Sequence, residues 1–211
     1  MGEKDFKLSR VIPVVLIAGL FFGAAAFFVL HHFVGPDRAG SDVEVVEAPL
    51  KNGERNGVAK VYLKGPKRIL IEEIPYVNGK KHGEMRGYDH DSGKLKLVKP
   101  YVNGLVHGEL RMYYPDSGKP HVVAPYVEGE PHGTAKWFHP SGAVRLEHHW
   151  VRGKEDGRAT WRDESGRVVA EGTYRNGKRW DGTFQVPVFD GLDMTGYRTR
   201  TFREGKEVEQ D

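Results

Sequence analysis

The sequence predicts a mainly β protein: an elongated array of β-hairpin repeats of about 25 residues each, which follows one N-terminal transmembrane α-helix. A motif typical of turns first occurs at residue 50 and returns every 24 or 25 residues from residue 76 onward. The runs between these turns are short and rich in aromatic and β-branched residues, as expected of strands. No sustained 3.6-residue apolar periodicity follows residue 35, so we expect few helices there.

The helix is predicted by an uncharged apolar segment over residues 11–34, which begins with the twenty residues VIPVVLIAGLFFGAAAFFVL. Twenty helical residues rise about 30 Å, the thickness of the hydrocarbon core of a membrane. We therefore expect an uncleaved signal anchor. A cleaved signal peptide is the alternative, because Ala24 to Ala26 resemble a cleavage region. The apolar run continues past these alanines to Leu30, which favours the anchor.

The flanking charges predict the orientation of this segment. Basic residues precede it at Lys4, Lys7 and Arg10, whereas the next fifteen residues contain Arg38 among four acidic residues. The positive-inside rule therefore places the N-terminus in the cytoplasm and the C-terminal domain outside it, in the periplasm of a bacterium.

The repeat is recognised by an aromatic residue, a turn of the Asn-Gly kind and a second glycine. YVNGKKHGE begins at Tyr76, YVNGLVHGE at Tyr101 and YVEGEPHGT at Tyr126. Related copies begin at Trp150 and Tyr174, a degenerate copy begins at Leu50, and a Ser-Gly turn recurs in phase. The positions expected to hold the hairpins are Tyr76, Gly79, Gly83, Tyr101, Gly104, Gly108, Tyr126, Gly129, Gly133, Trp150, Gly153, Gly157, Tyr174, Gly177 and Gly182.

These features divide the chain into five parts. In order, we expect a cytoplasmic N-terminus over 1–10, the transmembrane anchor over 11–34, a linker over 35–49, the hairpin repeats over 50–184, and a C-terminal cap and tail over 185–211.

The units resemble the MORN-repeat family, in particular its bacterial variant, in which Y-x-N-G-K-x-x-G is followed by an aromatic residue and a second turn. The resemblance covers about residues 50–184 and departs at Gly182, which comes one residue late. It implies a β-hairpin array used for membrane or protein association. Some bacterial relatives are described as antitoxin-like.

Three histidines, His82, His107 and His132, recur just before a glycine and raise the hypothesis of a metal ladder. Equivalent residues of successive hairpins should lie two strands apart, about 9 to 10 Å, which is too far to ligate one ion. Asn and Asp occupy the same slot in other units, and all three residue types tolerate a left-handed backbone. We therefore expect a turn role and no metal site.

Motifs of catalysis are absent from the sequence. The chain has no cysteine and no G-x-S-x-G, H-E-x-x-H, Walker, Rossmann or EF-hand pattern. We therefore expect no enzyme activity, no catalytic residue and no cofactor. The net charge of +3 from 32 basic and 29 acidic residues argues against nucleic acid as a partner.

Two aromatic residues, Tyr114 and Phe138, are predicted to contact another protein. Four other aromatic residues precede the Ser-Gly glycines by five positions and should stack on one face of the sheet: Tyr88, Tyr113, Trp137 and Trp161. Since side chains alternate along a strand, Tyr114 and Phe138 should point to the opposite face, where their own chain has nothing to cover them.

The sequence therefore predicts a single-pass membrane protein whose exported repeats form a scaffold or accessory subunit and bind another protein, itself membrane-associated. An antitoxin-like protein that sequesters a toxin is one alternative, and an envelope enzyme acting on glycan or lipid is another. Residues 50–211 carry a modest basic excess, so weak contact with anionic lipid is a further expectation.

Overall fold

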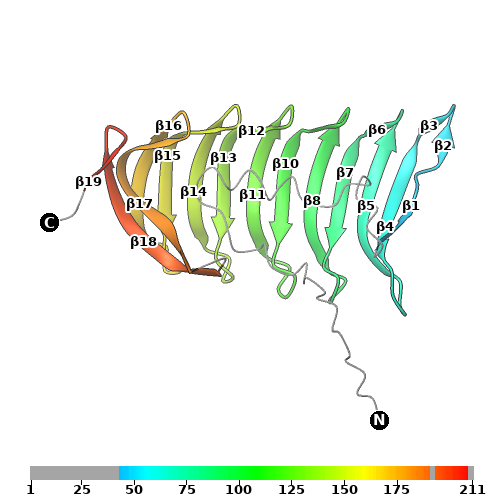
Figure 1. The fold of residues 1–211 in the computed structure, drawn as a ribbon, viewed down its shortest axis with the longest axis horizontal. Helices are drawn as coiled ribbons and strands as arrows, with labels where there is room; N and C mark the ends of the chain where they lie inside the picture. Colours follow the sequence, from blue (N-terminus) through cyan, green and yellow to red (C-terminus); the bar gives the residue numbers. More distant parts are fainter. Residues whose placement is uncertain (1–42, 191–192, 209–211) are drawn as a thin grey trace, which may run out of the picture.

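A computed structural model describes residues 43–190 and 193–208, which form one antiparallel sheet of 17 strands and a separate two-stranded ribbon. Figure 1 shows an elongated, curved sheet with β1 near one end and β19 at the other. The strands are β1 (Val43–Val46), β2 (Leu50–Lys51), β3 (Glu54–Arg55), β4 (Gly57–Leu63), β5 (Ile69–Val77), β6 (Lys80–Lys81), β7 (Gly83–Tyr88), β8 (Leu95–Val102), β9 (Leu105–Val106), β10 (Gly108–Tyr113), β11 (Pro120–Val127), β12 (Glu130–Pro131), β13 (Gly133–Phe138), β14 (Val144–Val151), β15 (Lys154–Arg162), β16 (Val168–Arg175), β17 (Lys178–Asp190), β18 (Asp193–Arg203) and β19 (Lys206–Val208).

The prediction of a mainly β, antiparallel fold is confirmed, and the described residues contain no helix. Within these residues, then, no helix is long and apolar enough to cross a membrane. The transmembrane helix expected over 11–34 lies outside the described residues.

The turns at one edge of the sheet, here called the Asn-Gly edge, are of type I′. Both central residues of the Asn78–Gly79 turn have positive φ, 48° and 74°. This combination twists the chain in the sense that a hairpin requires, and glycine adopts it without strain. Six other turns of the described chain repeat it, even where Glu128 or Arg152 takes the place of asparagine.

Successive Asn-Gly turns are joined by hydrogen bonds. The amide of Gly104 donates to the carbonyl of Lys81 at 2.8 Å, and the amide of Gly129 donates to the carbonyl of Val106 at 2.8 Å. Each turn is therefore stacked on the strand of the preceding unit, which ties the array together along this edge.

The recurring prolines lie opposite residues that separate two short strands, where the ladder of hydrogen bonds between strands is interrupted. The carbonyl of Pro75 accepts a hydrogen bond from the amide of His82 at 3.0 Å, and His82 separates β6 from β7. A residue in a strand directs its N–H and its C=O to the same side, so the missing N–H of Pro75 also faces this break. At the equivalent position His149 has an N–H, and β15 opposite it is continuous.

One face of the sheet is the core, and we call it the inner face. It contains the repeat aromatics at a few per cent exposure each: Tyr76 5%, Tyr101 8%, Tyr126 7%, Trp150 8% and Tyr174 4%. Residues two and four positions before each aromatic share this face, because side chains alternate. Ile74, Leu97, Leu110, Leu146 and Phe184 are among its largest fully buried side chains.

Both ends of the sheet differ from the predicted boundaries. Residues 43–46 of the predicted linker form β1, which pairs with β4, because Val43 and Val45 alternate with the exposed Glu44 and Val46 and pack on the core. At the other end, the predicted cap contributes β18 and β19, which continue the sheet as antiparallel strands.

The predicted aromatic column is also corrected by the register. Tyr88, Tyr113 and Phe138 each follow a register shift at the end of their strands and occupy equivalent positions. Trp137 and Trp161 lie one position earlier in their units, on the inner face. The connections to the first two Ser-Gly glycines are one residue longer, so counting back from these glycines misaligned the units.

Candidate functional site

Four exposed valines form a row on the outer face of the sheet, opposite the core. Each follows a repeat aromatic and is the last residue of its strand. We call Val77, Val102, Val127 and Val151 the valine column; their exposed fractions are 44%, 41%, 44% and 40%. Equivalent positions of neighbouring units are two strands apart, so the column repeats about every 9 to 10 Å.

The valine column has a supporting apolar neighbour in Leu105, which pairs with Val102 across β8 and β9 and is 51% exposed. Backbone pairing and stacked type I′ turns hold these side chains in place. An exposed apolar row on a rigid backbone is typical of a surface that binds a partner.

Charged pairs lie on the same face, four residues along the strands from the valine column. Lys60 contacts Glu73 at 3.3 Å and Lys136 contacts Glu147 at 3.2 Å. Hydrogen bonds from the Tyr88 hydroxyl and from Lys60 keep the pKa of the Glu73 carboxyl below its ordinary value. An apolar centre with a charged border has the composition of a protein interface.

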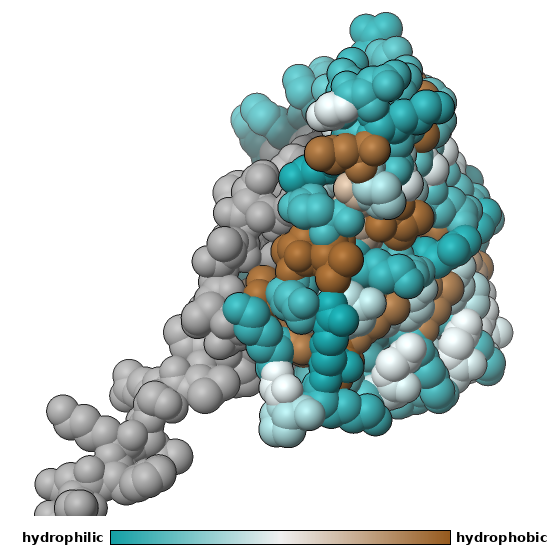
Figure 2. All heavy atoms as spheres, turned by 90° about the vertical axis from the view of Figure 1, so that its right-hand side faces the viewer, coloured by the Kyte–Doolittle hydropathy of each residue, from teal (hydrophilic) through white to brown (hydrophobic). Residues whose placement is uncertain are grey.

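Figure 2 faces the β1 end of the sheet and shows apolar side chains between polar ones there. Val46, Leu50 and Val58 are 42%, 69% and 45% exposed. Among the described residues, β1 has a pairing register with β4 alone, so its other edge is open there. This end therefore offers apolar side chains beside an open strand edge.

Tyr114 and Phe138, the predicted contact residues, are not equivalent in the structure. Phe138 ends β13, whereas Tyr114 lies beyond β10 in the following turn. The Tyr114 hydroxyl donates to the carbonyl of Phe138 at 2.8 Å, and its ring lies 4.4 Å from that of His121. Tyr114 is thus engaged with its own chain. The role of both residues in binding a protein stays a prediction.

The histidine slot has a different role from the expected one. His82, His107 and His132 are not among the described residues with positive φ. The side chains of His82 and His132 instead face the next turn, where their Nδ1 atoms lie 3.5 Å from the amides of Asn103 and Arg152. Asp156 in the same slot accepts from the amide of Asn176 at 3.0 Å. Within the described chain, no group of three potential ligands could hold a metal ion.

A buried carboxyl, Glu72, interrupts the apolar inner face. It is 2% exposed, and its Oε2 atom has no hydrogen-bond partner within the described residues. Burial raises its pKa to about 7, although the charges of Lys81 and Lys99 act in the opposite direction. Sequence analysis missed Glu72, because alternation predicts its face but not the absence of a bonding partner.

The sequence analysis also did not identify the valine column, although the recurrence of valine can be read from the sequence. Valine follows the repeat aromatic in four units, at a spacing of 24 or 25 residues. Without the register, nothing distinguishes an outward valine from a core valine.

A comparison with protein families supports the repeat interpretation. Residues 131–151 match the MORN repeat variant. The matched MORN repeat runs from the end of β12 to the last residue of β14 and includes Val151. It supports the assignment of these hairpins to the MORN-repeat family, whose repeats suggest a scaffold for protein interaction or membrane association. No curated protein matches the chain.

Proposed function

We propose that this protein is a single-pass, membrane-anchored scaffold or accessory subunit that binds another membrane-associated protein through the valine column and catalyses no reaction. The valine column carries the proposal: four valines, each at least 40% exposed, recur at one position of a regular sheet. Burying such a row against a partner removes apolar area from water. The MORN repeat at residues 131–151 supports a scaffold.

The proposed anchor is the apolar segment over residues 11–34, with residues 1–10 in the cytoplasm and the repeats on the other side of the membrane. Its support is the length of the segment and the excess of basic residues before it. An anchor of this kind would hold the sheet close to other proteins of the same membrane.

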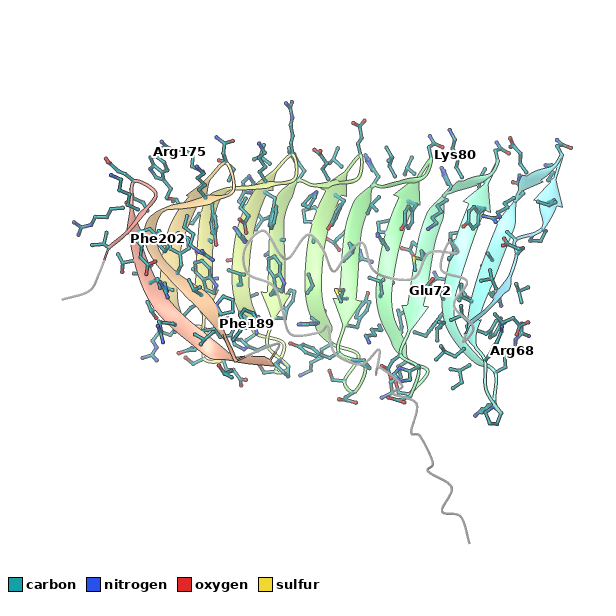
Figure 3. All side chains as sticks on the ribbon, in the orientation of Figure 1. Arg68, Glu72, Lys80, Arg175, Phe189 and Phe202 are labelled. Atoms are coloured by element: carbon teal, nitrogen blue, oxygen red, sulfur yellow. The ribbon has the colours of Figure 1, made fainter. Side chains whose placement is uncertain are left out.

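Weak contact with anionic lipid is proposed as an addition to this anchor. Lys80 and Arg175 are exposed near the Asn-Gly edge (Figure 3). Basic side chains near a membrane surface each contribute about 1 kcal/mol of attraction to anionic headgroups.

The proposal is tested by site-specific photocrosslinking of the full chain in its native membranes. A photoreactive phenylalanine derivative replaces Val102 in one variant and Val127 in another. A third variant, the control, has it at Glu164, an exposed residue on the opposite edge. We expect both valine positions, but not the control position, to give one discrete adduct with a membrane-associated protein, which mass spectrometry identifies.

A second experiment introduces negative charge into the valine column. Combining a crosslinker at Val102 with Val77→Asp and Val127→Asp should abolish the adduct, because a carboxylate would be buried in the interface. Persistence of the adduct in this variant, or an equal adduct from Glu164, contradicts the proposal. Identification of a toxin as the partner would replace the scaffold with the antitoxin-like alternative.

A further inference from the structure

A pocket lies on the inner face near the C-terminal end of the sheet. It has a volume of about 250 Å³ and is lined by Glu155, Tyr174, Gly177, Lys178, Arg179, Phe202 and Gly205. Glu155 pairs with Trp150 across β14 and β15, and Arg179 pairs with Tyr174 across β16 and β17. Phe202 projects from β18 (Figure 3) and closes the apolar side of the pocket.

The residues around the pocket differ from those of the unit before it. In the unit before it, the two inner-face positions beside the aromatic hold Ala124 and Pro131. The equivalent positions at the pocket hold His148 and Glu155, which are 2% and 4% exposed. Burial of polar groups costs free energy unless they are bonded. The preceding unit has small apolar residues at both positions, whereas Lys99 and Lys81 occupy the equivalent positions of earlier units.

The polar groups in and beside the pocket satisfy one another only in part. His148 Nε2 lies 3.9 Å from Glu155 Oε1, too far for a hydrogen bond. His148 Nε2 and Arg179 Nε have no hydrogen-bond partner within the described part of the chain. The Arg179 guanidinium lies 5.8 Å from the centroid of the Phe202 ring, and Tyr174 also interacts with it. The Arg179 guanidinium therefore lies near the apolar Phe202 ring, and its buried Nε atom has no hydrogen-bond partner among the described residues.

The ionisable groups near Glu155 come from three strands: His148 from β14, Tyr174 from β16 and Arg179 from β17. Lys178 also lines the pocket, but it pairs with Arg175, and alternation directs its side chain to the outer face. Burial lowers the pKa of His148 to about 3, with the charge of Arg179 acting in the same direction. Burial raises the pKa of Glu155 to about 7, against the opposing charge of Arg179. Burial also keeps the pKa of Tyr174 far above its ordinary value. Burial thus favours the uncharged forms of His148, Glu155 and Tyr174, and the Arg179 guanidinium brings a positive charge to the pocket.

We propose that this pocket binds a small organic acid, with the carboxylate of the ligand on the Arg179 guanidinium and its apolar body against Phe202 and Tyr174. Arginine presents a planar set of donors that matches a carboxylate. The volume is smaller than that of pockets for drug-sized ligands, so the ligand is a small one. The site is separate from the valine column, which lies on the other face.

Benzoate is the probe, and benzamide is its uncharged control of the same shape. Calorimetry with the full chain in detergent micelles at pH 6 should show saturable binding of benzoate and at least tenfold weaker binding of benzamide. Arg179→Gln should weaken benzoate binding at least tenfold. Arg175→Gln is the matched control, because Arg175 lies over the Trp180 ring at 4.1 Å, is exposed and does not line the pocket. It should leave the affinity unchanged.

The pH dependence tests the geometry independently. Because Glu155 ionises above about pH 7, benzoate affinity should fall by up to about tenfold per pH unit above that value. Glu155→Gln should remove this fall and bind benzoate more tightly than the natural protein at pH 8. If Arg179→Gln fails to fold by circular dichroism, the Glu155→Gln profile decides. Equal binding of benzamide, no saturable binding of benzoate, or the same pH profile in both proteins overturns the proposal.

Discussion

The ring of Phe184 fills the space above Gly172 on the inner face of the sheet. A Cβ atom at Gly172 would clash with Cζ of Phe184, closer than side-chain contacts allow. Phe184 is fully buried, and its ring also meets those of Tyr174 and Phe202 edge-on, at 5.1 and 5.4 Å between centroids. The Phe184 ring of β17 therefore packs in space that a side chain at Gly172 of β16 would occupy.

Gly172→Ala should therefore destabilise the sheet. Overpacking of this kind costs about 1 to 3 kcal/mol, because the aromatic ring must leave its preferred position. Urea denaturation followed by circular dichroism measures the loss. Gly65→Ala is the control, since its nearest neighbour would be a carbonyl oxygen at 3.8 Å and its φ is not positive. An equal free energy of unfolding for the two variants would show that the Phe184 ring can move aside without destabilising the fold.

Glu72→Gln should stabilise the protein at alkaline pH. The pKa of Glu72 is raised to about 7 from 4.5, so between these values the unfolded chain loses a proton that the folded chain retains. Stability therefore falls as pH rises through this range and stays lower above it. The variant should lack this fall, a difference of up to about 3 kcal/mol at pH 8. Parallel urea titrations at pH 4.5 and pH 8 measure it, and an equal fall in both proteins would contradict the assignment.

His148→Leu should have the opposite pH signature. The folded chain takes up a proton at His148 only near pH 3, whereas the unfolded chain does so near the ordinary value of 6.5. The natural protein therefore loses stability as pH falls from 6.5 toward 3. Thermal melting at pH 4 and pH 7 should show a smaller acid-induced loss in the variant. If His148 were already charged in the folded state, the natural protein and the variant would lose the same stability between pH 7 and pH 4.

Asp156→Ala tests the bond between successive units. Its Oδ2 atom accepts from the amide of Asn176 at 3.0 Å, and a net contribution of about 1 kcal/mol is expected for such a bond. Hydrogen exchange measured by NMR should show faster exchange of the Asn176 amide in the variant. Glu164→Ala, a change of an exposed carboxylate at the other edge, should leave this amide unaffected.

Particular residues show how far the sequence predicts this structure. Asn78 and Gly79 predict their turn, since the type I′ geometry is a local property of two residues. The valine column and the positions of Trp137 and Tyr113 depend on register instead. One residue more or less in a connection shifts a side chain to the other face, so these positions follow from pairing with a neighbouring strand.

The candidate pocket was beyond prediction for a related reason. His148, Glu155 and Arg179 come from three strands, and nothing in their own segments indicates that they meet. By itself the sequence determined the repeat, its turns and the β class, because these depend on the φ preferences of single residues and on short-range alternation. Only the tertiary structure decided which valines face outward and which polar groups are buried without partners, because both depend on side chains that different strands bring together.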